Sequence, residues 1–148
     1  MGRETDIGVE EELIHLTKRP AFRIRRELDQ VLGAEGVTWA QFTYLRTVYE
    51  KRADTPSRIA RLFSVATGAI TRLTDRLERG GFLLRRASKG DRRLVRIVLT
   101  EKGRRLVEAL APAARGQISR LCGKMNQAEL KNLTQLMKEL LVGGEGAE

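Results

Sequence analysis

Apolar residues recur at helical spacing along most of the chain. The first such pattern predicts a helix over about 9–32, in which Pro20 introduces a kink or starts a new helix, because proline lacks the amide that a helix interior requires. Gly33 and Gly36 end this element. A second helix is expected over 38–51, where Thr38 and Gln41 have the spacing of a capping box and an apolar stripe is formed by Phe42, Leu45 and Tyr49.

Two short helical patterns joined by a tight turn come next. Thr55 and Pro56 are typical of a helix start, and Ile59 and Leu62 are expected to form its buried face. The following helix buries Ile70, Leu73 and Leu77 and leaves on its other side Thr67, Gly68, Thr71, Arg72, Asp75 and Arg76. This pair has the order of a helix-turn-helix, whose second helix meets base edges with its outer face. The alternative is an ordinary amphipathic helix with a solvated face.

Two short alternating segments, 82–87 and 94–99, predict a β-hairpin with a basic turn. In the second segment Val95, Ile97 and Leu99 share one face. A hairpin directly after a helix-turn-helix makes a winged helix, whose tip is placed to enter the minor groove. The hairpin therefore favours the DNA-binding interpretation of the preceding helices.

The remaining residues form amphipathic helices outside this core. Thr100 caps a helix that Pro112 is expected to bend, and Asn126 starts the last helix. Apolar helices at both ends most simply pack on each other and on a second copy of the chain. The expected fold is mainly α with a small β-hairpin wing: a dimerisation region at 1–37, a winged helix-turn-helix core at 38–100, and dimerisation helices at 101–148.

The charge is concentrated in the predicted core. Residues 55–100 hold 11 of the 28 Lys and Arg residues but only 3 of the 19 acidic ones, which gives +8 of the total +9. Such a field indicates a polyanionic partner, and double-stranded DNA fits best. RNA-binding proteins usually add exposed aromatic residues for stacking, but here only 5% of residues are aromatic, most of them at apolar helical positions.

Several other classes of protein are disfavoured. No apolar run of 18 residues and no secretory signal pattern is found, so no membrane partner is expected and a cytoplasmic location follows by default. The single cysteine, Cys122, and the single histidine supply neither a disulfide framework nor a metal site, so no metal or cofactor is expected. The absence of nucleophile, phosphate-loop and metalloprotease motifs argues against an enzyme.

Motifs in this order resemble the MarR family of bacterial transcriptional regulators. Residues 38–42 are similar to the family's "LTxxQF" motif, and residues 91–93 and 99–103 are similar to its wing-tip signature and its "LTxxG" motif. The resemblance implies a homodimer of winged-helix subunits that binds a pseudo-palindromic operator, here as a repressor, and is often released by a small anionic aromatic ligand. The alternative is a winged-helix protein without an effector, either architectural or RNA-binding.

The resemblance also assigns site residues. It implies that Arg93 enters the minor groove, that Asp91 orients it, and that Lys89 and Arg92 contact the DNA backbone. Candidates for base contacts on the recognition helix are Thr67, Thr71 and Arg72, whereas Arg76 is expected to contact a phosphate. The chain departs from the family pattern at Ala66, Gly68 and Ala69, which weakens the helix start and leaves few groups for base readout.

An effector cleft between the dimerisation helices and the winged core is also implied by the resemblance. Basic groups beside aromatic ones suit an aromatic carboxylate, and the candidate lining residues are His15, Arg19, Arg23, Trp39, Phe42 and Tyr49. The alternative for the aromatic residues is core packing, and for the basic ones a solvated helix face.

Overall fold

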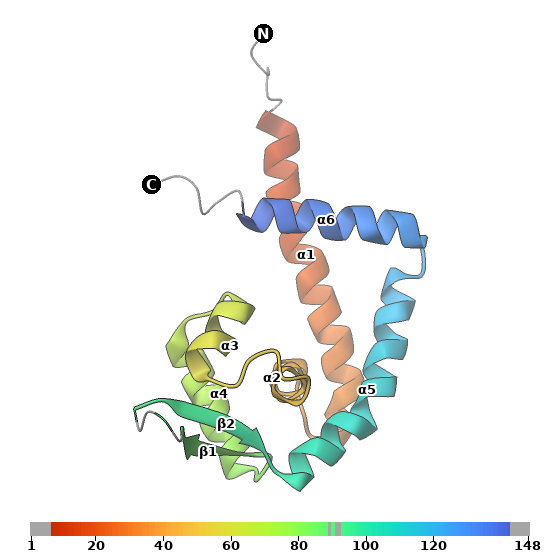
Figure 1. Ribbon diagram of the computed structural model, residues 1–148. Helices are drawn as coiled ribbons and strands as arrows, with labels where there is room; N and C mark the ends of the chain where they lie inside the picture. The colour runs from red at the N-terminus through yellow and green to blue at the C-terminus, as the bar shows by residue number, and fades with distance from the viewer. Residues whose placement is uncertain (1–6, 89, 91–92, 143–148) are drawn as a thin grey trace.

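The computed structural model describes residues 7–88, 90 and 93–142 and shows a mainly helical protein with one β-hairpin (Figure 1). The elements follow the order expected for a winged helix-turn-helix core between terminal helices. They are α1 (Ile7–Leu32), η1 (Gly33–Glu35), α2 (Trp39–Tyr49), α3 (Pro56–Phe63), α4 (Thr67–Arg79), β1 (Leu83–Ala87), β2 (Val95–Leu99), α5 (Glu101–Cys122) and α6 (Gln127–Val142).

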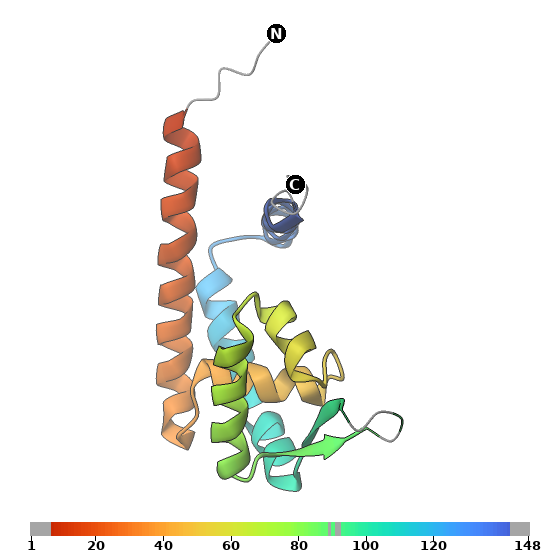
Figure 2. The same cartoon turned by 90° about the vertical axis from the view of Figure 1, so that its left-hand side faces the viewer.

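Helix α1 runs unbroken through Pro20, so no new helix starts there, and it forms one long rod in Figure 2. Its C-terminal part is anchored in the protein, because Leu28 and Leu32 are fully buried. Its N-terminal part stays open to solvent. Gly36 ends the following turn with φ 70°, a left-handed conformation that glycine adopts without steric penalty. The structure confirms this terminator.

Helix α2 lies at the centre of the core. Its capping box is present: the Thr38 hydroxyl accepts from the Gln41 amide at 3.2 Å, and the Gln41 side chain accepts from the Thr38 amide at 2.9 Å. Phe42 and Leu45 are fully buried, as the stripe predicts, and so is Tyr44, whereas Tyr49, the third residue of the predicted stripe, is 39% exposed. The capping groups are local in sequence, which is why the pattern located this helix start correctly.

Helices α3 and α4 form the helix-turn-helix. The turn passes through Ser64, which has φ 51° and ψ 45°, and this left-handed residue reverses the chain after α3. The prediction that Leu62 is buried is wrong, since this side chain is 43% exposed. Ala60 is buried beside Ile59 instead, and Phe63 packs against the core, so the buried face of α3 runs through positions 59, 60 and 63 and leaves Leu62 outside it.

Helix α4 is fixed to α2 by a buried polar contact. The Tyr44 and Thr74 hydroxyls lie 2.8 Å apart, and the Thr74 hydroxyl also donates to the Ile70 carbonyl at 2.7 Å. Burial raises the pKa of Tyr44 above its ordinary value. A satisfied polar pair in the core sets the position of α4 on its support more specifically than apolar packing alone.

The wing is an antiparallel pair of strands in which Leu83 lies opposite Leu99 and Arg85 opposite Ile97. Leu83, Ile97 and Leu99 are buried, as the alternation predicts, but Val95 of the same predicted face is 37% exposed, because it pairs with Ala87 at the outer end of the hairpin. The base of the wing also contacts the start of the helix-turn-helix, because the Ile97 amide donates to the Asp54 carbonyl at 2.7 Å.

Helix α5 starts where the wing ends. The Thr100 hydroxyl accepts from the Gly103 amide at 3.1 Å and donates to the Gly81 carbonyl at 2.6 Å. A Cβ on Gly103 would lie 2.1 Å from the Phe82 carbonyl oxygen, so only glycine allows this approach. The threonine and the glycine thus join the end of α4, the wing and α5 at one point.

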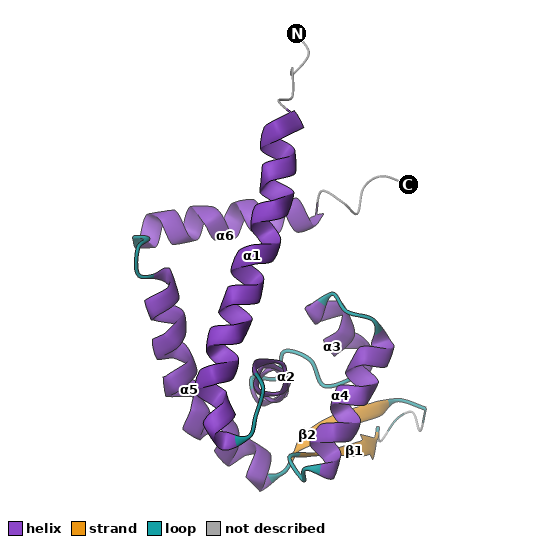
Figure 3. Ribbon diagram, turned by 180° about the vertical axis from the view of Figure 1, so that it is seen from behind, coloured by secondary structure: helices purple, strands orange, loops and turns teal. Residues whose placement is uncertain are grey.

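The terminal helices leave a large apolar surface uncovered. Helix α6 has no buried residue; it follows the far end of α5 (Figures 1 and 3), and the turned view in Figure 2 shows that it stands away from α1. A cavity of about 870 Å³ lies between α1, the end of α5 and α6. Among the described residues, no helix is both long and apolar enough to cross a membrane. Exposed apolar side chains on α6 are Leu133, Leu136, Met137, Leu140, Leu141 and Val142.

Candidate nucleic-acid interface

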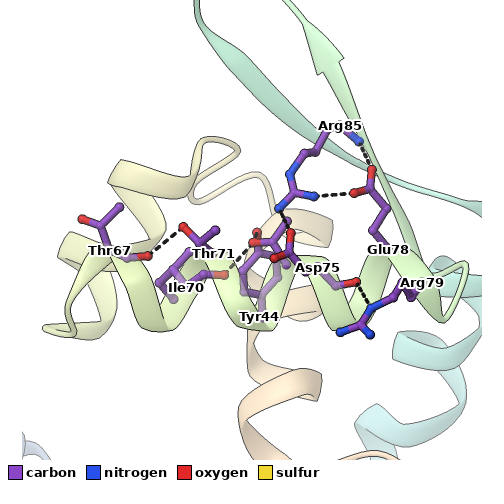
Figure 4. Close-up of polar contacts among 9 residues, drawn as sticks. Tyr44, Thr67, Ile70, Thr71, Asp75, Glu78, Arg79 and Arg85 are labelled. Carbon is purple, nitrogen blue, oxygen red and sulfur yellow. Dashed lines mark hydrogen bonds and ion pairs between the residues drawn. The ribbon is translucent and has the colours of Figure 1, made fainter.

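The outer face of α4 carries the four side chains expected to meet DNA. Thr67, Thr71, Arg72 and Arg76 are all exposed. The Thr71 hydroxyl donates to the Thr67 carbonyl at 3.0 Å (Figure 4). Its proton is therefore used within the helix, which leaves the oxygen as an acceptor for an external donor.

The first turn of α4 lacks a side-chain cap, as the sequence indicates. Ala66 occupies the N-cap position in an extended conformation and makes no side-chain hydrogen bond. A Cβ on Gly68 would meet open space, so neither packing nor a positive φ requires glycine there. The loss of a cap and a glycine in the first turn each destabilise a helix by about 1 kcal/mol.

Asp75 and Glu78 both bind Arg85 of the wing. The sequence places Asp75 on the outer face of α4, but its Oδ1 atom accepts from Arg85 Nη2 at 2.5 Å. Glu78 accepts from the Arg85 amide at 3.1 Å through Oε1 and from the Arg85 guanidinium through Oε2. These bonds, first to Asp75 and then to Glu78, raise the pKa of Arg85 above its ordinary value.

The wing projects beside α4, as Figure 2 shows. Arg93 is exposed in the turn that leads into β2. The other three predicted wing residues, Lys89, Asp91 and Arg92, lie outside the described residues. The structure thus brings the four α4 candidates to one helix face and puts Arg93 on the neighbouring hairpin.

The six effector candidates do not form one site within a chain. Arg19 and Arg23 line the cavity between α1, α5 and α6, and Arg23 also pairs with Glu27 at 2.7 Å. His15 lies on the open part of α1. The aromatic candidates are elsewhere, in or near the α2 core: Phe42 is fully buried, Trp39 lies on it at 5.8 Å between ring centroids, and the Tyr49 hydroxyl donates to Glu108 at 2.9 Å.

Two arginines of the wing strands were not singled out by the sequence patterns. Arg85 binds α4, and Arg96 of the second strand pairs with Asp54 before α3. Alternation puts Arg96 on the strand face opposite Ile97, where a solvated cation is expected, and puts Arg85 on the face of Leu83 without indicating a partner for its charge. Only the tertiary arrangement shows that they connect the wing to the helix-turn-helix.

Comparisons with known proteins agree with this architecture. Residues 37–95 match the family model described as MarR family. The chain is 27% identical over 142 residues to the transcriptional repressor MprA of Escherichia coli K12, a match that covers 94% of this chain and 81% of that protein.

Two solved structures are similar along most of their length. One is a cysteine mutant of MarR from Escherichia coli complexed with operator DNA, with a TM-score of 0.78, 27% identity, and coverage of 95% of this chain and 99% of the other. The second is BpsR of Bordetella bronchiseptica, in a structure that concerns regulation of its DNA binding by 6-hydroxynicotinic acid; the TM-score is 0.77, the identity 25%, and the coverage 87% and 98%.

Proposed function

Because this chain is a winged helix-turn-helix protein of the MarR family, we propose that it represses transcription by binding a pseudo-palindromic operator as a homodimer. The observation that carries the proposal is the exposed face of α4 beside the basic wing, in the segment that holds almost all of the net positive charge. Thr67, Thr71 and Arg72 take the base edges, whereas Arg76 takes a phosphate. This function involves no catalysis.

The homodimer is supported by the uncovered apolar surface of the terminal helices. An α6 helix without buried residues is not stable in water by itself, because most helical stability in proteins comes from packing an apolar face. A second copy of the chain supplies the missing cover. In this proposal the DNA-binding core is residues 38–100, and the subunit interface is formed by residues 1–37 and 101–148.

A small anionic aromatic ligand is the proposed signal for release from DNA. The support is the cavity between α1, α5 and α6, which has apolar walls and the guanidinium groups of Arg19 and Arg23. The similar BpsR structure concerns regulation by such a compound, 6-hydroxynicotinic acid. Since the cavity lies in the proposed dimer region, ligand binding there changes how the two DNA-binding cores are spaced.

Salt-dependent titration tests the DNA-binding function. A dimer that neutralises 6–10 phosphates releases the cations condensed on them when it binds. This release is less favourable at higher salt, so the affinity falls by about 10³ to 10⁵ between 50 and 200 mM salt. We expect this loss for a duplex operator, measured by fluorescence anisotropy, and weaker binding to single-stranded RNA of equal length. A flat salt dependence contradicts the proposal, and tighter binding to the RNA supports an RNA-binding winged helix instead.

A further inference from the structure

The wing has few internal interactions that fix its direction. Each strand has only five residues, and a two-stranded hairpin by itself is marginally stable in water. Its orientation relative to α4 therefore depends on contacts with the helices. Buried apolar residues hold the base of the hairpin, where Leu83 lies opposite Leu99.

Arg85 is the polar contact between the wing and the recognition helix. It lies two residues beyond Leu83 on the same strand face, and it binds both Asp75 and Glu78 of α4, as Figure 4 shows. Glu78 holds the strand twice, since one carboxylate oxygen accepts from the Arg85 guanidinium and the other from its backbone amide. A contact to the backbone fixes the strand itself and not only a side chain.

The opposite side of α4 is fixed as well. The buried Tyr44 and Thr74 hydroxyls join α4 to α2, and Thr74 directly precedes Asp75. Helix α4 therefore cannot rotate to follow the wing without breaking this bond. Because α4 is held in place on α2, the hydrogen bonds of Arg85 to α4 also fix the position of the wing relative to α2.

These polar groups add little to the stability of the fold. The side chains of Arg85, Asp75 and Glu78 are 30%, 46% and 33% exposed, and ion pairs with such access to water are worth little. Moreover, two carboxylates next to a DNA-binding face repel phosphates. A role of these two carboxylates in DNA binding that outweighs the repulsion accounts for their position on α4.

We infer that Glu78 and Asp75 are positioning residues for operator binding: they hold the wing through Arg85 at the angle that lets α4 and the wing occupy neighbouring grooves together. The inference rests on the proposed function. This role and the charge of the carboxylates predict opposite changes in DNA affinity when one of them is removed. Removal of an acidic side chain from a DNA-binding face tightens binding by electrostatics, whereas removal of a positioning contact weakens it.

The test uses the full-length chain and the duplex that it enriches most strongly from a randomised library. Glu78→Ala is expected to weaken operator binding by about 10-fold, because the wing of each subunit then makes its groove contact less well. Because Ala favours the helix and the ion pair is partly open to water, the melting temperature is expected to change by no more than about 4 °C. Glu101→Ala removes an equal charge from the first turn of α5, outside the cluster, and is expected to leave affinity unchanged or slightly higher.

A double variant shows whether the two residues act through one contact. If Glu78 acts through Arg85, the Glu78→Ala/Arg85→Gln variant binds no more than about 2-fold more weakly than the weaker single variant. Binding of Glu78→Ala that equals or exceeds that of the unmodified chain overturns the inference and leaves the proposed function intact. Failure of the unmodified chain to enrich any duplex overturns the proposed function, and the inference with it.

Discussion

Arg93→Ala is expected to weaken operator binding by about 100-fold, because a dimer loses one groove contact from each of two wings and each contact is worth about 1–3 kcal/mol. Arg93 is exposed on the hairpin beside α4. A guanidinium suits the negative potential of a narrow minor groove, where it also replaces counterions. Fluorescence anisotropy with a labelled operator duplex measures the change.

Arg105→Ala serves as the control for this substitution. Arg105 is an exposed cation of α5 that pairs with Glu101, so its removal changes the net charge equally without touching the wing. We expect an affinity within about 3-fold of the unmodified chain, since a distant surface charge is largely screened. Sedimentation must show that the Arg93→Ala protein remains folded and dimeric. An unchanged affinity in that protein would remove Arg93 from the interface.

Leu133→Asp is expected to separate the proposed dimer. Leu133 lines the apolar cavity between α1, α5 and α6 and is 46% exposed in the single chain. An aspartate that a partner subunit must cover loses its hydration without gaining a counterion, which costs several kcal/mol and raises the dimer dissociation constant by at least about 1000-fold. Operator affinity falls with it by at least about 100-fold, since one subunit reaches only one half-site.

Gln135→Asp is the matched control on the same helix. Gln135 is exposed and pairs only with Glu139 among the contacts described, one turn further along α6. A charge at this polar position is expected to leave the dimer intact in analytical ultracentrifugation. If Leu133→Asp also remains dimeric at micromolar concentration, the apolar face of α6 is not the subunit interface.

The order and type of the elements could be predicted because their signals are local. The sequence indicates three helix starts through Thr38 with Gln41, Thr55 with Pro56, and Thr100, and all three starts are present. The alternating pattern likewise predicted the burial of Ile97 and Leu99 on the inner face of the wing, but not the exposure of Val95 near its tip. Such signals depend on backbone hydrogen bonding and strand geometry, which do not require knowledge of the rest of the fold.

The wrong or missing details depend on contacts between distant residues. Leu62 fits a helical apolar stripe, but the face of α3 that packs on the core runs through Ile59, Ala60 and Phe63 instead. Helical periodicity places Asp75 on the outer face of α4. It does not reveal the partner of Asp75, because Arg85 lies ten residues further along the chain, on a strand. The effector candidates share a chemical character and not a location, so a search by residue type collected groups from separate parts of the molecule. The assigned DNA contacts stay predictions.

Selection of duplexes from a randomised library, followed by sequencing, tests the central claim most directly. If the chain acts as a winged-helix homodimer on DNA, the enriched sequences contain an inverted repeat whose half-sites are centred about 10 base pairs, one helical turn, apart. Enrichment of a single unrepeated motif, or of no duplex above the starting library, would contradict the proposed homodimeric regulator.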